Sequence, residues 1–244
     1  MRGRYRGRND ERVKRKLVLF DIDGTLVLTG GAGLRAMNRA LEEVFAQANV
    51  LDGIPLAGRT DWAILSDAVR RIGRSLDGAL LADLEQRYVT NLADEIQHPG
   101  TGRKEVLPGI REILADLERR DDVFVGLVTG NFEAGARVKL GYFDLWRYFS
   151  CGAFGGDAAD RNALVPFALE RARACGLPDI ADEDILVVGD TPRDITCAHA
   201  AGAIAVGVAT GSSPVEDLAA AGAQHVFTDL GDTAAFLRLL DAPA

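Results

Sequence analysis

Carboxylates follow two short apolar runs of this chain, at places where they could hold a cation or react with a substrate. Asp21 and Asp23 follow the run at 16–20, and Asp190 and Asp194 follow the run at 185–188. In an extended segment Asp21 and Asp23 point the same way. Two such carboxylates repel each other unless a cation or a proton separates them. Four carboxylates at two strand ends predict an oxygen-rich site for a hard cation such as Mg²⁺.

A hydroxyl group and a guanidinium group lie at the ends of other predicted elements. Thr129, Gly130 and Asn131 follow the apolar run at 123–128. The Thr129 hydroxyl and the backbone N–H groups near Gly130 could donate hydrogen bonds to a phosphate. Arg161 precedes a helical pattern and could neutralise a phosphate. Taken singly, Thr129 could instead be an ordinary helix cap, and Arg161 an ordinary surface residue.

The elements that must bring these groups together are predicted by two alternating patterns. Apolar runs bounded by Gly and Asp, typical of parallel strands buried on both faces, occur at 16–22, 123–128, 185–188, 204–208 and 225–227. From residue 105 onward these runs alternate with helical patterns, such as Ile110, Ile113, Leu114 and Leu117. The alternation predicts a doubly wound, Rossmann-like α/β sheet. Such sheets bind ligands at the carboxyl ends of their strands.

A region with a different pattern separates the first strand from the second. Residues 34–97 show no strand pattern and carry three amphipathic stripes, which begin at Leu34, Ile64 and Leu81. Glycine-rich segments at 29–33 and 98–102 bracket them. We therefore expect a basic arm over 1–16, an α/β core over 17–29 and 104–244, and an inserted all-helical domain over 30–103.

One polar segment, Gly58-Arg-Thr-Asp61, lies between the inserted helices. Its Arg59 could bind a carboxylate or a second phosphate of a substrate. The segment could equally be a helix start capped by Thr60 or Asp61.

The composition excludes several classes of protein. The chain has 244 residues, 48% of them hydrophobic and 26% charged, which is close to an average globular protein. Its three cysteines have no CxxC spacing, so we expect free thiols and a cytoplasmic protein. No apolar run approaches the roughly 20 residues of a membrane-spanning helix.

The charge is distributed unevenly along the chain. The net charge is −8, yet the first 16 residues hold eight Arg or Lys against two acidic residues. Such an arm could bind nucleic acid, although a solvated tail is the interpretation that we favour. The acidic remainder argues against a nucleic-acid-binding body.

Together, these segments resemble the haloacid dehalogenase superfamily of phosphohydrolases over about residues 16–236. The segment Asp-Ile-Asp-Gly-Thr-Leu at 21–26 matches the first motif, DxDGTL, and Gly-Asp-Thr-Pro-Arg-Asp at 189–194 matches the fourth, GDxxxD. Thr129 matches the second motif. The third is usually a lysine. Arg161 is the best-placed residue for it, since Lys139 lies close behind Thr129 within the next helix. The inserted helices resemble the family's cap, and phosphoglycolate-phosphatase-like members look most similar.

This resemblance implies a mechanism for a Mg²⁺-dependent phosphatase. Asp21 would attack the phosphorus of a monoester and form an aspartyl-phosphate. Asp23 would protonate the leaving alcohol and then activate a water molecule. Mg²⁺ would be held by the Asp21 carboxylate, the backbone carbonyl of Asp23, and Asp190, with Asp194 as a ligand or behind the ligands.

The remaining roles also follow from the resemblance. Thr129 and Arg161 would bind the phosphoryl oxygens, and Gly130, Asn131 and Arg59 the substrate. Members that cleave carbon–halogen bonds lack the second aspartate, so Asp23 favours phosphoryl transfer.

We expect a small phosphorylated metabolite as the partner, no membrane and, apart from the arm, no nucleic acid. We expect a monomer or a homodimer. The alternatives are a phosphomutase acting on a sugar phosphate and a non-catalytic phosphate-binding protein.

Overall fold

Six parallel strands form the central sheet, in the order β5-β4-β1-β6-β7-β8. The computed structural model describes residues 15–241. Its sheet strands are β1 (Lys16–Phe20), β4 (Val123–Val128), β5 (Cys151–Ala153), β6 (Ile185–Gly189), β7 (Ile204–Val208) and β8 (His225–Phe227). The predicted α/β sheet is confirmed. Strand β5 was not predicted, because its three residues, Cys-Gly-Ala, are too short a run to show a strand pattern.

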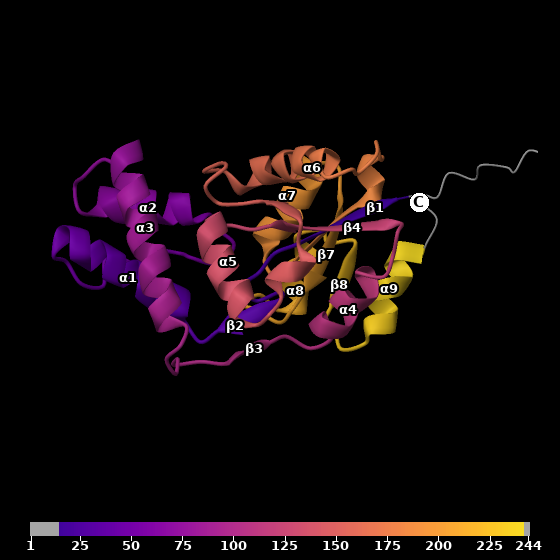
Figure 1. The fold of residues 1–244 in the computed structure, drawn as a ribbon, viewed down its shortest axis with the longest axis horizontal. Coiled ribbons are helices and arrows are strands. Elements are labelled where there is room, and N and C mark those ends of the chain that lie inside the picture. The colour runs from indigo at the N-terminus through magenta and orange to yellow at the C-terminus, as the bar shows by residue number, and fades with distance from the viewer. Residues whose placement is uncertain (1–14, 242–244) are drawn as a thin grey trace, which may run out of the picture.

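Helices cover both faces of the sheet, and Figure 1 shows α6 and α7 above it and α4 and α9 below it. One face packs against α4 (Ile110–Leu117), α5 (Glu133–Tyr142) and α9 (Thr233–Asp241), and the other against α6 (Leu164–Ala174), α7 (Pro192–Ala200) and α8 (Val215–Ala220). Along β1, Val18 and Phe20 join the first apolar cluster, and Leu17 and Leu19 join the second. Burial on both faces explains why the strand sequence is continuously apolar.

Three further helices form an apolar cluster beside the sheet. They are α1 (Ala32–Phe45), α2 (Asp61–Arg71) and α3 (Gly78–Glu95), and Leu41, Leu65 and Leu84 are fully buried among them. In Figure 1 this cluster stands at one end of the molecule. The chain reaches it through an antiparallel pair that the sequence did not indicate, β2 (Val27–Thr29) and β3 (Lys104–Val106). The division into an arm, a core and an inserted domain stays a prediction.

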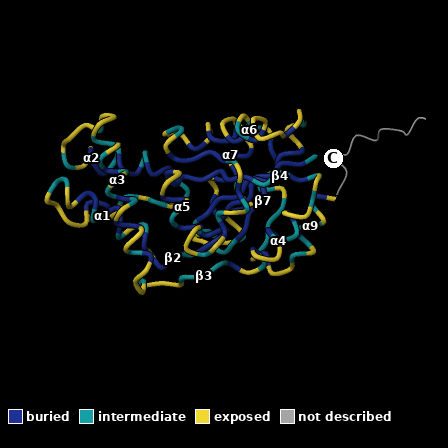
Figure 2. Tube along the Cα trace, viewed as in Figure 1, coloured by how far each residue is buried: buried dark blue, intermediate teal, exposed yellow. Residues whose placement is uncertain are grey.

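The register of the sheet brings the residues of interest to one edge. Phe20, the last residue of β1, pairs with Leu127 of β4 and with Val188 of β6. The segments that follow these three strands therefore leave the sheet side by side. Figure 2 shows the strands as the buried centre of the molecule, so these segments start from a rigid base.

Other expectations concern the ends of the chain and its cysteines. Most of the predicted basic arm, residues 1–14, lies outside the described residues. Lys16, which the predicted arm included, is instead the buried first residue of β1 and pairs with Asp184 at 3.5 Å. The three cysteines are free thiols, as predicted. Within residues 15–241, no helix has both the length and the apolar character to cross a membrane.

Candidate active site

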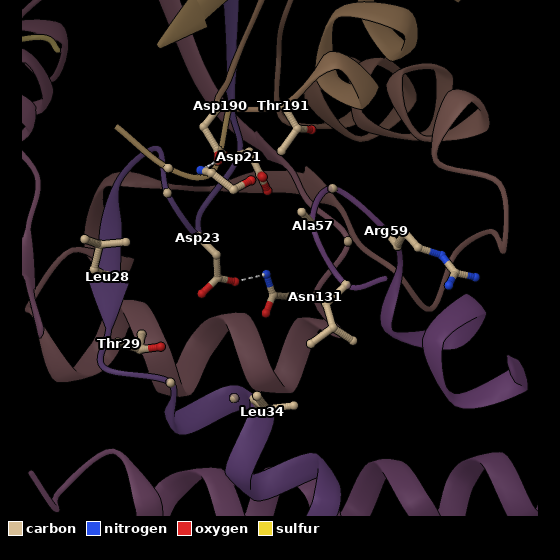
Figure 3. Close-up of a pocket in the computed structure, with 18 of the residues that line it drawn as sticks. Asp21, Asp23, Leu28, Thr29, Leu34, Ala57, Arg59, Asn131, Asp190 and Thr191 are labelled. Atoms are coloured by element: carbon tan, nitrogen blue, oxygen red, sulfur yellow. Dashed lines mark hydrogen bonds between the residues drawn. The ribbon is translucent and has the colours of Figure 1, made fainter. Parts of the chain in front are cut away.

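Two carboxylates emerge together because β1 and β6 are parallel neighbours. Asp21 follows the last residue of β1, and Asp190 follows the last residue of β6. Asp194 joins them from the first turn of α7. One carboxylate oxygen from each lies within 4.8 Å of the others, and all three residues are buried. Figure 3 shows Asp21 and Asp190 next to each other at the edge of a cavity.

The oxygens of Asp194 and Asp190 differ in their hydrogen bonds. Oδ2 of Asp194 accepts from the backbone N–H of Thr191 at 3.0 Å and from its hydroxyl at 2.7 Å, and Oδ1 accepts from Arg161. Oδ2 of Asp190 accepts from the backbone N–H of Ser212 at 3.3 Å. Oδ1 of Asp190 is buried and has no hydrogen-bond partner among the described residues. Asp190 therefore has a free ligand atom, whereas Asp194 is already engaged.

Arg161 is the cation of this buried cluster. It lies in the 3₁₀ turn η2 (Arg161–Ala163), and its side chain is only 6% exposed. Its Nη2 lies 3.2 Å from Oδ2 of Asp21 and also pairs with Asp194. Arg161 therefore links the segment after β1 with the start of α7. At this position its guanidinium group could also contact phosphoryl oxygens.

The electrostatics of the cluster favour a bound cation. Burial raises the pKa of Asp21 to about 6, although Arg161 opposes the shift. Burial, together with the charges of Asp194 and Asp21, raises the pKa of Asp190 to about 8. Three carboxylates face one guanidinium, so the ionised cluster lacks positive charge. Carboxylate oxygens are preferred ligands of hard divalent cations, and the unpartnered Oδ1 of Asp190 is placed to serve as one. These residues fit a divalent metal ion.

Asp23 turns away from this cluster, and its side chain is 45% exposed (Figure 3). Its Oδ2 accepts hydrogen bonds from Nζ of Lys139 at 2.6 Å and from Nδ2 of Asn131 at 2.9 Å. Nζ of Lys139 also donates to Oδ1 of Asn131 at 2.6 Å. The three side chains form a closed triangle that holds one oxygen of Asp23.

Lys139 is not among the predicted site residues, because its spacing from Thr129 argued against it as the third-motif lysine. The structure brings it to the site from the buried side of α5, which it shares with Gly135, Ala136 and Leu140. A lysine on a stripe of otherwise small and apolar residues was the available signal, since a buried ammonium group needs a partner. The identity of that partner could not be found from the stripe.

Thr129 supports the side chain of Asn131, two positions later in the chain. Oγ1 of Thr129 accepts hydrogen bonds from the backbone N–H of Asn131 at 3.3 Å and from its Nδ2 at 2.8 Å. Thr129 is fully buried. It therefore orients Asn131, which in turn contacts Asp23.

The guanidinium group of Arg59 turns away from the carboxylates (Figure 3). It donates to Oδ2 of Asp67 at 2.6 Å and to the carbonyl oxygens of Pro55 and Ala63. Thr60 caps α2, since its hydroxyl accepts from the backbone N–H of Ala63 at 3.2 Å. The segment is thus a capped helix start, and substrate binding by Arg59 stays a prediction.

Asp61 begins α2 and joins it to the loop after β4. Its backbone N–H donates to the carbonyl oxygen of Gly130 at 2.7 Å, and its Oδ2 accepts from the backbone N–H of Phe132 at 2.9 Å. Gly130 permits this approach, because a Cβ there would lie 2.0 Å from the carbonyl oxygen of Arg59. Burial raises the pKa of Asp61 to about 7, and the charge of Lys139 opposes the shift. The sequence identified Asp61 only as a possible helix cap.

A cavity of about 620 Å³ connects these groups with α1 and α2. The predicted site residues that line it are Asp21, Asp23, Arg59, Gly130, Asn131, Arg161 and Asp190. Thr129 and Asp194 are not among its lining residues. The structure therefore places a buried carboxylate, a buried cation and a half-exposed carboxylate around one space. That combination can transfer a phosphoryl group and a proton.

Comparisons with known proteins show which proteins this chain is similar to. Residues 18–208 match the family model described as haloacid dehalogenase-like hydrolase. The chain is 26% identical over 222 residues to a phosphoglycolate phosphatase from Photorhabdus laumondii, which covers 89% of this chain and 90% of that protein. It is 30% identical over 186 residues to a phosphoglycolate phosphatase from Cereibacter sphaeroides, with coverage of 76% and 81%.

A solved structure shows the same fold. The crystal structure of a hydrolase from Pseudomonas syringae matches with a TM-score of 0.65 at 23% identity. The match covers 92% of this chain and 98% of that chain. The likeness therefore includes the helices α1–α3 as well as the sheet.

Proposed function

This chain belongs to the haloacid dehalogenase-like hydrolase family, and we propose that it is a phosphatase acting on a small phosphate monoester. Its strongest support is the placement of Asp21, whose carboxylate lies 3.2 Å from Arg161 in a buried cluster that fits a divalent cation. Asp23, two residues further on, is held at the cavity by Lys139. The phosphatase relatives support the same reaction class.

The first step forms a covalent bond to the protein. A carboxylate oxygen of Asp21 attacks the phosphorus, and the bond between phosphorus and the alcohol oxygen breaks. Asp23 gives its proton to that departing oxygen. Arg161 neutralises the charge of the non-bridging oxygens, and we assign further hydrogen bonds to Thr129 and Gly130. The products of this step are the free alcohol and an aspartyl-phosphate on Asp21.

The second step restores the protein. Asp23, now ionised, removes a proton from a water molecule whose oxygen attacks the phosphorus of the aspartyl-phosphate. The bond between phosphorus and Asp21 breaks, and inorganic phosphate leaves. Asp21 is again a carboxylate and Asp23 is again protonated.

We propose Mg²⁺ as the cation, held by the Asp21 carboxylate, the backbone carbonyl of Asp23, and Asp190. Both oxygens of Asp194 already accept hydrogen bonds, which supports its acting behind the ligands. When bound, the ion would supply positive charge against the carboxylates and the phosphate dianion. We also propose that residues 30–103 form a helical cap, because the cavity is lined by side chains of α1 and α2 as well as of the strand ends.

Phosphate release from a panel of phosphorylated metabolites tests the proposal. We expect turnover with Mg²⁺, none with EDTA, and none from Asp21→Asn. Asp179→Asn is a matched control, because that side chain is 96% exposed. Turnover by Asp21→Asn at the wild-type rate would contradict the proposal. Release of the free sugar from a sugar phosphate would argue against the phosphomutase alternative, since a mutase returns the phosphoryl group to the substrate.

A further inference from the structure

Hydrocarbon side chains of β2, of α1 and α2 and of the connection between the two helices form the wall of the cavity that faces Asp23. They are Leu28, Leu34, Met37, Leu51, Leu56 and Ile64. Leu34 is 44% exposed and is one of three exposed large hydrophobic residues within residues 15–241. Figure 3 shows Leu28 and Leu34 bordering the same open space as Asp23. An exposed leucine in a ligand-sized cavity is a surface that an apolar ligand would cover.

The cationic side chains that line the cavity already face carboxylates of the chain itself. The pairs are Arg59–Asp67, Arg103–Glu105, Lys139–Asp23 and Arg161–Asp21. Arg161 lies at the carboxylate cluster, where the phosphoryl group would bind. Among the described lining residues, no unpaired cation remains for a second negative group on the substrate. Asp61 adds a further buried carboxyl group to the wall.

A substrate with a second anion would therefore meet an unfavourable environment. Its carboxylate would lose hydration against leucine and isoleucine side chains and gain no free cationic partner. It would also lie among several carboxyl groups of the protein. Phosphoglycolate, the substrate named for the curated relatives, carries such a carboxylate on its two-carbon alcohol.

The size of the cavity points in the same direction. A volume of about 620 Å³ lies within the range of about 300–1,000 Å³ that is typical of pockets for drug-sized ligands. A phosphate group and two further carbons would leave most of the apolar wall uncovered.

We infer that the alcohol half of the substrate is an uncharged, largely hydrocarbon group of several carbons, which packs against Leu34, Met37 and Ile64. The inference rests on the proposed function, since it assigns the leaving alcohol of that reaction. The phosphoryl group lies at Asp21 and Arg161, and the hydrocarbon part extends past Asp23 toward α1.

A series of n-alkyl phosphates from ethyl to hexyl, compared with phosphoglycolate, tests the inference with Mg²⁺ present. We expect kcat/KM to rise along the series by up to about fourfold per methylene, the factor for complete burial of a CH₂ group. We expect phosphoglycolate to be a poorer substrate than ethyl phosphate, which carries a methyl group in place of the carboxylate. Equal kcat/KM along the series, or a preference for phosphoglycolate, would overturn the inference.

Paired variants locate the effect. Leu34→Lys places an ammonium group on the apolar wall, so we expect the ratio of kcat/KM for phosphoglycolate to that for hexyl phosphate to rise at least tenfold. Phe167→Lys is the matched control, because Phe167 is also an exposed hydrophobic residue but lies on α6 and does not line the cavity. That control should leave the ratio unchanged. An unchanged ratio in Leu34→Lys would overturn the assignment of Leu34.

The two proposals fail differently in this experiment. Hydrolysis of the esters with the wrong order of preference would overturn the inference and leave the phosphatase assignment intact. No release from any ester, by folded protein with Mg²⁺, would overturn the phosphatase assignment and the inference with it.

Discussion

The ammonium nitrogen of Lys139 lies 2.6 Å from Oδ2 of Asp23, and Asn131 donates to the same oxygen at 2.9 Å. Two donors thus hold one carboxylate oxygen and leave the other, Oδ1, to exchange a proton with a substrate. A half-exposed aspartate would otherwise rotate among several conformers. The pair predicts that Lys139 positions Asp23 for proton transfer.

Replacing Lys139 by methionine should reveal this role through the leaving group. We expect kcat/KM for an alkyl phosphate to fall about 10²-fold, at the lower end of general acid catalysis. For p-nitrophenyl phosphate we expect little change, because p-nitrophenolate departs without a proton. The comparison uses kcat/KM, which reports the steps up to release of the alcohol.

Arg137→Met is the control for this variant. Arg137 lies on the same helix, but its side chain is 60% exposed and pairs with Glu133. We expect Arg137→Met to leave kcat/KM unchanged for both substrates. An equal loss on both esters in Lys139→Met would mean that Lys139 supports the fold or the phosphate rather than Asp23.

Replacing Arg161 by methionine should destabilise the protein strongly. The change leaves Asp21 and Asp194 without their buried counter-charge, and breaking a buried ion pair costs about 3–5 kcal/mol. Urea unfolding at pH 8 in EDTA measures the free energy. Arg171→Met is the control, since Arg171 is 41% exposed and pairs with Asp157, and we expect a loss of about 1 kcal/mol or less. Similar losses in both variants would contradict the account of the cluster.

Asp61 should make the stability of the protein depend on pH. Burial raises its pKa from 3.8 to about 7, against the charge of Lys139, while Asp23 and Glu85 add to the shift. Between these values the folded state binds the proton more tightly than the unfolded chain. The free energy of unfolding therefore falls as the pH rises from about 4 to about 7, and the loss is complete above that range.

The variant Asp61→Asn removes this titration and can still accept the hydrogen bond from Phe132. Urea unfolding of both proteins across pH 4–9 gives the difference directly. We expect the wild type to lose stability relative to the variant up to about pH 7, with a constant difference above it. A difference that is flat from pH 4 to 7 would show that Asp61 titrates normally.

Asp190→Asn should weaken metal binding, and this loss can be measured without an activity assay. Asp190 has a buried carboxylate oxygen with no hydrogen-bond partner among the described residues, and this oxygen is placed to serve as a ligand. Calorimetric titration of metal-free protein with Mg²⁺ should show at least about a tenfold loss of affinity. Replacing a residue that only hydrogen-bonds to a metal ligand already costs about this much. The control variant Asp179→Asn, changed at an exposed position, should bind Mg²⁺ with the affinity of the wild type. Unchanged affinity in Asp190→Asn would mean that the ion binds elsewhere.

The sequence was sufficient for the features that depend on local patterns. Continuous apolar runs identified five sheet strands, because strands buried on both faces need such runs. The carboxylates at 21 and 190 were correctly placed together, since parallel neighbours end at one edge of a sheet. Of the four three-residue strands within residues 15–241, β8 was found and β2, β3 and β5 were missed, because so short a segment carries no periodicity that would separate it from a loop.

Pairings between distant side chains could not be predicted. Lys139 and Asp23 are 116 positions apart, and nothing in either segment specifies the other. Arg59 was a candidate for substrate binding, and nothing in the sequence indicated that its guanidinium group pairs with Asp67, eight positions later on α2. Such pairings depend on how α1, α2 and α5 pack against the rest of the molecule, and this packing is set by the tertiary fold.

The central claim is that Asp21 carries the phosphoryl group. Its most direct test is to mix Asp23→Asn with p-nitrophenyl phosphate and Mg²⁺, quench in acid, and locate the bound phosphoryl group by mass spectrometry. The good leaving group allows the first step, whereas loss of the Asp23 base stalls the second. The account predicts one p-nitrophenol released per active site and one phosphoryl group on Asp21. A phosphoryl group on another residue, or continued turnover with an unmodified Asp21, would contradict it.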